Sequence, residues 1–136
     1  MQSDRCPFCE RIARGELTAS SDLAAAFPDA YPLSPGHTLV VPRRHEPDFF
    51  ALSTDELTEL MAVAVDLHER LSEELGIDGM NLGVNAGITS GQTIAHAHIH
   101  LIPRYEGDVP DPAGGIRWML PEKARYWEGT APEPKI

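Results

Sequence analysis

The chain has 136 residues, a hydrophobic fraction of 42% and a formal net charge of -10. A chain of this length buries a core as one domain, and none of its stretches approaches the roughly 20 apolar residues of a membrane span. The acidic balance excludes a general nucleic-acid groove, although local backbone N–H groups and imidazoles can still hold a small phosphorylated ligand.

The first half of the chain predicts a short helix, two strands and a long helix. Residues 7–14 are expected to be helical, with Pro7 in the first turn and Gly15 as the stop. Residues 23–27 and 38–41 are β-like and joined by the turn-rich PDAYPLSPG, which predicts an antiparallel pair. Ser53 and Glu56 form a capping box before an amphipathic helix that ends at Gly76. Its apolar residues are Leu57, Leu60, Met61, Ala64, Leu67, Leu71 and Leu75.

The second half predicts two further strands, residues 81–84 and 97–102, separated by the glycine-rich NAGITSGQTIA. After Pro103 the chain turns irregular. The expected fold is therefore α+β: a twisted, mainly antiparallel sheet of about five strands, with the long helix packed on one face.

Three of the six histidines stand at alternate positions in HAHIHLIPR, the segment from His96 to Arg104. In a strand such residues share one face, so His96, His98 and His100 lie together. Ala97, Ile99 and Leu101 then form the opposite, core-facing side. Three imidazoles on one face are costly to bury unless paired, which favours a functional role.

Two chemistries fit such a row. Three imidazoles bind zinc with an open position for water, as in a metal hydrolase. Alternatively, one neutral imidazole is a nucleophile that splits a phosphoryl substitution into two easier steps. The spacing is compatible with either.

The row resembles the histidine triad (HIT) superfamily of nucleotide hydrolases and transferases. It is preceded by Gly91-Gln92-Thr93 and followed by Pro103-Arg104. The likeness extends to HTLVVPRRH at 37–45, NLGVNAG at 81–87 and the amino-terminal CPFC. It covers about residues 6–104, so we expect a single HIT-like domain over 1–136 with a C-terminal extension from about 105.

The resemblance implies an enzyme in which His98 attacks the α-phosphorus of a nucleoside phosphate ester, anhydride or phosphoramidate. Water then releases a nucleoside monophosphate from the nucleotidyl-histidine. The catalytic set implied by the family is His96, His98, His100 and Thr93. The implied substrate is a purine nucleotide, held at its phosphate by Asn85, Gln92, Thr93 and His100. The family also implies a homodimer.

Two further positions depend on the resemblance. Asp29, eight residues before His37, matches the family's ribose-binding acid, whose carboxylate accepts from both sugar hydroxyls. An Asp after Pro28 is also ordinary turn chemistry, and both interpretations stay open. Asn85 occupies the position at which the phosphoramidase-like branch tends to carry Asn and the dinucleoside-polyphosphate branch Gln.

Cys6 and Cys9 predict a metal site. The opening MQSDRCPFCE lacks a secretory signal, so we expect a cytoplasmic protein with reduced thiols. A CxxC supplies two ligands of a tetrahedral zinc site, with His45 and His96 as candidates for the others. Bacterial members that resemble this sequence use that ligand set. A redox CxxC lacks a βαβ context here, and two idle buried thiols are the remaining alternative.

The expected cofactor is thus structural zinc, with no organic cofactor, because neither a Walker loop nor a GxGxxG pattern occurs. The competing function is a purine-nucleotide-binding or zinc-dependent interaction module that keeps the triad but turns over little.

Overall fold

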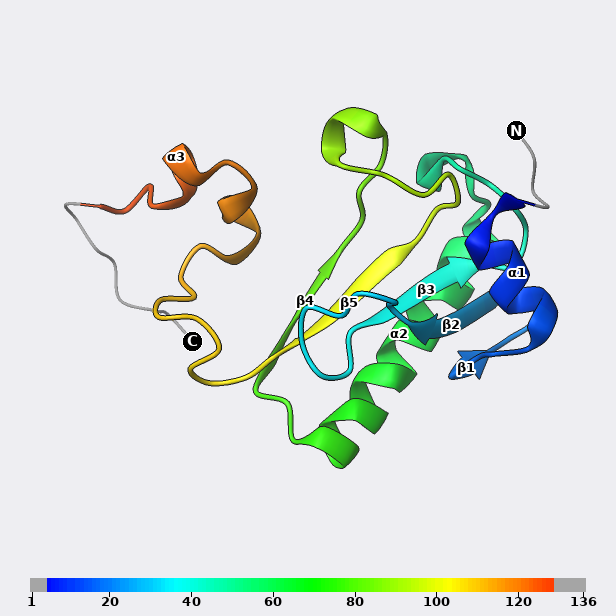
Figure 1. Cartoon of the computed structure of the whole chain (residues 1–136), viewed down its shortest axis with the longest axis horizontal. Coiled ribbons are helices and arrows are strands. Elements are labelled where there is room, and N and C mark those ends of the chain that lie inside the picture. Colours follow the sequence, from blue (N-terminus) through cyan, green and yellow to red (C-terminus); the bar gives the residue numbers. More distant parts are fainter. Residues whose placement is uncertain (1–4, 129–136) are drawn as a thin grey trace. The chain divides into compact units, whose positions relative to one another are not determined.

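The computed structural model describes residues 5–128, which divide into one unit ending at Tyr105 and another beginning at Glu106. The first unit carries a five-stranded antiparallel sheet in the order β1-β2-β3-β5-β4 (Figure 1). Its strands are β1 (Ala19–Ser20), β2 (Ala24–Pro28), β3 (Thr38–Pro42), β4 (Gly79–Gly83) and β5 (Ile99–Arg104). The predicted α+β fold with a five-stranded sheet is confirmed.

The register of β5 fixes where the histidines stand in the sheet. His100 pairs with Leu39 of β3 on one side and with Gly83 of β4 on the other. Strand β5 begins two residues later than predicted. The reason is that the Ala97 N–H donates to the Glu46 carbonyl, at 2.7 Å, rather than to a neighbouring strand.

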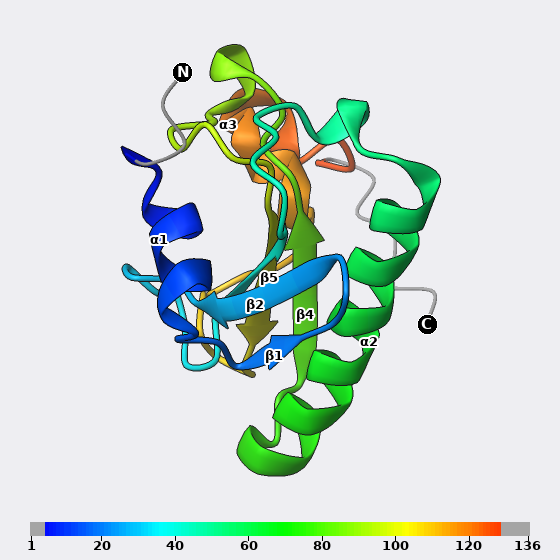
Figure 2. The same cartoon turned by 90° about the vertical axis from the view of Figure 1, so that its right-hand side faces the viewer.

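Two helices cover opposite faces of the sheet (Figure 2). On one face, α2 (Thr54–Leu75) packs Leu60 and Leu67 against Ile99 and Leu101 in a single core cluster. On the other, α1 (Pro7–Arg14) contributes Phe8 to a cluster with β2 and β3 residues. Ala97 joins the α2-side core as well, so the predicted apolar side of the histidine segment is confirmed.

The buried stripe of α2 differs from the predicted one. Met61 is 45% exposed, whereas Val63, which the predicted stripe omits, is buried. At 3.6 residues per turn, position 61 lies about 100° round the helix from Leu60, which is the centre of the stripe. The two-residue strand β1 was also not predicted, because two residues carry no periodicity.

The predicted capping box at the start of α2 is confirmed. The Glu56 N–H donates to Ser53 Oγ at 3.1 Å, and the Ser53 N–H donates to Glu56 Oε1 at 2.9 Å. Arg44 adds two hydrogen bonds to the same carboxylate, at 2.9 and 3.1 Å. The Arg44 bonds, followed by the Ser53 N–H, lower the pKa of Glu56 to about 2.

Glu56→Gln should therefore lower stability in a pH-dependent way. Because the folded-state pKa lies below the usual value of 4.5, the carboxylate stabilises the fold fully above that value. Its contribution is lost as the pH falls towards 2. We expect urea denaturation to show a difference of about 1 kcal/mol at neutral pH that narrows in acid. Asp66→Asn, on the exposed side of α2, is the charge control; equal effects of the two variants would contradict the prediction.

The second unit contains a 3₁₀ helix, Gly115–Met119, and a short helix, α3 (Pro121–Ala124). Trp118 donates to the Ala113 carbonyl at 2.9 Å, and Arg125 pairs with Asp111 at 2.8 Å. Within residues 5–128, none of the helices is long and apolar enough to cross a membrane.

Candidate functional site

His98 is held in one tautomer by the backbone. Its Nδ1 lies 2.8 Å from the His96 carbonyl oxygen, which only accepts, so the ring proton sits on Nδ1. Nε2 of the neutral ring then carries a free lone pair. This is the state that a nucleophilic imidazole requires.

Two aromatic neighbours fix the orientation of the His98 ring. Phe8 from α1 meets it edge to face, with centroids 5.1 Å apart and an interplanar angle of 86°. His100 lies against the ring at 5.0 Å and 66°. The His98 side chain is buried, so its rotamer is set by packing as well as by the hydrogen bond.

His100 belongs to a hydrogen-bonded cluster with His37 and Asp29. Nε2 of His37 lies 3.0 Å from Nδ1 of His100 and 3.3 Å from Oδ2 of Asp29. His37, immediately before β3, is only 3% exposed. His37 belongs to the motif HTLVVPRRH, but the sequence predicts no role for it. Its position beside His100 depends on the pairing of β3 with β5.

Burial keeps these imidazoles neutral. It lowers the pKa of His37, with Asp29 opposing the shift. Burial also lowers the pKa of His100, and the nearby His98 and His37 rings add to the effect. Both pKa values therefore lie below the ordinary 6.5, and both rings are neutral at pH 7.

Asp29 uses its two oxygens differently. Oδ1 accepts from the Tyr31 N–H at 2.8 Å, which is the turn chemistry expected of an Asp at this place. Oδ2 faces His37 and lies 3.8 Å from Nδ1 of His100. Asp29 is thus both a turn residue and a neighbour of the histidine row.

Gln92 orders the loop before the histidines. Its Oε1 accepts from the Gly87 N–H at 2.8 Å, and its Nε2 donates to the carbonyls of Pro47 and Ile94 at 2.9 and 3.0 Å. The side chain of Asn85 lies beside Gly91, and Thr93 is exposed. Three of the four predicted phosphate-binding residues thus belong to one loop, in which Gln92 holds the backbone; the fourth, His100, lies in β5.

Cys6, Cys9, His45 and His96 come together beside this row, with ligand atoms all within 4.8 Å of one another. Cys6 Sγ lies 3.4 Å from His96 Nδ1, and Cys9 Sγ lies 3.3 Å from His45 Nδ1. Zinc bonds of about 2.3 Å to sulfur and 2.0 Å to nitrogen place tetrahedral S and N ligands about 3.5 Å apart. The spacing of the four atoms therefore suits zinc.

The chemistry of the donors agrees with the spacing. His96 Nε2 donates to the Pro42 carbonyl at 2.8 Å, so its Nδ1 is a bare acceptor facing the thiols. Burial, with Cys6 adding to it, raises the pKa of the Cys9 thiol to about 11, and a bound cation reverses that preference. His45 Nδ1 faces the Cys9 thiol at 3.3 Å, while its Nε2, among residues 5–128, is buried without a hydrogen-bond partner.

A second group, Asp29, His37 and His100, also places its ligand atoms within 4.8 Å of one another. It is a poorer metal site, because the Leu33 N–H donates to His37 Nδ1 at 3.0 Å. Nε2 of His37 must then keep its proton and cannot bind a cation. His96 and His100 thus fall into different groups, which weighs against one zinc held by the three alternate histidines.

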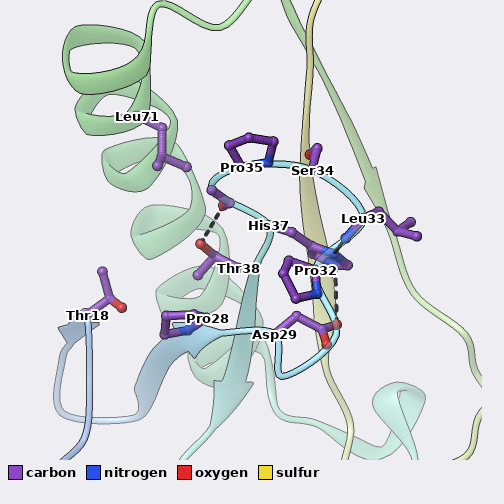
Figure 3. A pocket seen from close by; sticks show the side chains of 11 residues that line it. Thr18, Pro28, Asp29, Pro32, Leu33, Ser34, Pro35, His37, Thr38 and Leu71 are labelled. Atoms are coloured by element: carbon purple, nitrogen blue, oxygen red, sulfur yellow. Dashed lines mark hydrogen bonds and ion pairs between the residues drawn. The ribbon is translucent and has the colours of Figure 1, made fainter. Parts of the chain in front are cut away.

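A pocket of about 570 Å³ is lined largely by the loop from Asp29 to His37 (Figure 3). Pro28, Thr38 and Leu71 line it, and Pro28 pairs with Thr38 in the sheet. These two residues alternate with Phe27 and Leu39, which pack on the α1 side, so the pocket opens on the α2 face. Asp29 and His37, which contact His100, also line it, so the pocket borders the histidine cluster.

Comparisons with known proteins agree with this geometry. The family model of the HIT domain matches residues 12–107. An uncharacterized HIT-like protein of Methanocaldococcus jannaschii is 41% identical over 107 residues, covering 76% of this chain and 81% of that protein. An adenylylsulfatase of Arabidopsis thaliana is 35% identical over 112 residues, covering 79% of this chain and 56% of that protein.

A solved structure carries the same fold. The crystal structure of a zinc-bound histidine triad family protein from Mycobacterium smegmatis matches with a TM-score of 0.72 at 28% identity. The match covers 81% of this chain and 86% of that one. Because the family model spans more than half of the chain and relatives above 30% identity cover most of it, the chain belongs to the HIT domain family.

Proposed function

We propose that this protein is a nucleotide hydrolase or nucleotidyl transferase that acts at an α-phosphorus through His98. The observation that carries the proposal is the bond from His98 Nδ1–H to the His96 carbonyl, which leaves Nε2 bare. Family membership and an adenylylsulfatase among the relatives support it.

The proposed reaction has two displacements. Nε2 of His98 forms a bond to the α-phosphorus while the bond to the leaving group breaks, and the leaving group takes the electron pair. Charge that builds up on the imidazolium is stabilised by the His96 carbonyl at Nδ1. Water then attacks the phosphorus, its proton is released, and the P–Nε2 bond breaks to give the nucleoside monophosphate and free His98.

Other residues are proposed to bind the substrate, a purine nucleotide. Asn85, Thr93 and His100 donate to phosphate oxygens, with Gln92 shaping the loop that holds the first two. The Asp29 carboxylate is the proposed acceptor for the ribose hydroxyls. His96 anchors the row through its ring and its carbonyl.

Structural zinc is proposed at Cys6, Cys9, His45 and His96, where the spacing of the ligand atoms and the bare Nδ1 of His96 suit it. When bound, it supplies a cross-link between α1 and the sheet rather than reaction chemistry. Family membership also supports a homodimer. Light scattering at micromolar concentration tests it, and a monomer mass would contradict the homodimer.

A substrate panel tests the proposed function. Adenosine phosphoramidate, a diadenosine polyphosphate and adenylyl sulfate are each incubated with the protein, and release of AMP is measured. We expect turnover of at least one, and Asn85 favours the phosphoramidate. Tight binding of nucleotides without turnover of any of the three would overturn the proposal in favour of a binding module.

A further inference from the structure

One backbone N–H sets the tautomer of His37. The Leu33 amide donates to Nδ1 of His37 across 3.0 Å. An amide N–H cannot accept, so His37 Nδ1 must carry a lone pair and the ring proton must sit on Nε2. The tautomer of His37 is therefore set by the loop, and Asp29 Oδ2, an acceptor 3.3 Å from Nε2, favours the same tautomer.

That proton determines the state of His100. His37 Nε2–H points to His100 Nδ1 at 3.0 Å, with Asp29 Oδ2 as a second acceptor at 3.3 Å. His100 Nδ1 thus accepts, and the proton of the neutral His100 ring is on Nε2. Protonating His100 at Nδ1 would bring two N–H groups face to face at that distance.

Hydrogen bonds and packing hold the loop from Asp29 to His37 in place, so the loop can determine which nitrogens of His37 and His100 carry protons. Ser34 Oγ donates to the Pro103 carbonyl at 2.6 Å, and the Tyr105 hydroxyl donates to the Pro35 carbonyl at 2.8 Å. Gly36 has a φ of +89°, and a Cβ there would lie 3.0 Å from Leu75 Cδ1. These contacts are made by the three residues between Leu33 and His37, and they fix the position of the Leu33 N–H.

We propose that His37 is a positioning residue, and that it and the Leu33 amide hold His100 as a neutral donor with its proton on Nε2. Resting on the proposed function, this assigns His100 a hydrogen bond to a non-bridging or leaving-group oxygen of the bound phosphate. It excludes His100 as a cationic clamp. His100 thus binds a phosphate ester or anhydride through a directional N–H hydrogen bond rather than through a positive charge.

Nitrogen-15 NMR of histidine-labelled protein at pH 7 reads the tautomers directly. We expect both His37 and His100 to be neutral, with Nδ1 bare and Nε2 protonated. His100 found as an imidazolium or with its proton on Nδ1 would overturn the proposal. This measurement needs no substrate, so its failure is distinguishable from failure of the proposed enzymatic function.

A pair of substitutions at Leu33, whose side chain is 75% exposed, isolates the backbone donor. Leu33→Pro removes the N–H, whereas Leu33→Ala removes the side chain and keeps the N–H. We expect Leu33→Ala to keep the His37 and His100 tautomers and Leu33→Pro to give mixed tautomers at both rings. The same spectrum from both variants would overturn the role of the amide.

Activity variants at His37 separate positioning from folding. His37→Phe keeps a ring but offers no donor, so kcat should fall roughly 10- to 100-fold with a smaller change in KM. His37→Gln, whose amide supplies an N–H, should recover most of the loss. His68→Phe, on the exposed side of α2, is the unaffected control. Equal kcat for wild type and His37→Phe, or no recovery by the folded Gln variant, would overturn the proposal.

Discussion

His98→Ala is expected to abolish turnover and to leave nucleotide binding nearly intact. The substitution removes the only atom proposed to bond to phosphorus, while the donors around the phosphate remain. We expect kcat to fall by at least roughly a thousandfold. Binding of AMP, measured by calorimetry, should change by less than about threefold. His100→Ala should weaken both binding and turnover, because it removes a phosphate donor.

The covalent intermediate gives a second measurement on the same residue. A reaction with labelled substrate is stopped without acid, because a phosphorus–nitrogen bond to histidine is acid-labile, and the adduct is located by mass spectrometry. The wild-type protein should carry the nucleotide on His98. An active His98→Ala variant, with no adduct in the wild type, would show that water attacks directly.

Cys9→Ala should abolish zinc binding and lower the thermal stability of the fold. Cys9 Sγ faces both histidine ligands, at 3.3 Å from His45 and 3.6 Å from His96, so its loss opens the site on two sides. A ligand present at a thousand times its Kd stabilises a fold by about 4 kcal/mol. We therefore expect the Tm to fall by on the order of 10 °C.

The matched comparison is wild-type protein treated with a chelator. It should unfold at nearly the same temperature as Cys9→Ala, and the chelator should have little further effect on the variant. Metal analysis of freshly purified protein should give about one zinc per chain. Protein that contains no zinc and whose two thiols react freely under native conditions would contradict the metal site.

Local patterns in the sequence predicted the elements well. The Ser53–Glu56 capping box and the Gly15 stop of α1 were correct because each depends on a few neighbouring residues. The core-facing side of Ala97, Ile99 and Leu101 was correct because strand alternation is local too. Met61 was misplaced, since spacing by three and four does not fix where the centre of a helical stripe lies.

Contacts between site residues on different strands and loops could not be predicted from the sequence, because they depend on strand pairing and loop conformation. His37 meets His100 only because β3 lies beside β5, and the order of strands in a sheet leaves no mark within either strand. The acceptor for His98 is the carbonyl of His96 because of the turn before β5. Likewise, the contact between the Leu33 amide and His37 depends on the conformation of the loop between β2 and β3.

The double use of His96 has a consequence for mutational scanning. Its ring faces Cys6, whereas its main-chain oxygen accepts a hydrogen bond from His98 Nδ1–H. Side-chain replacement at this position removes the first contact and leaves the second, since every amino acid keeps its carbonyl. A library of His96 variants would therefore score the residue only by the contacts of its ring, with the thiols and with the Pro42 carbonyl. The contact that orients the nucleophile would stay invisible to any survey that changes only side chains.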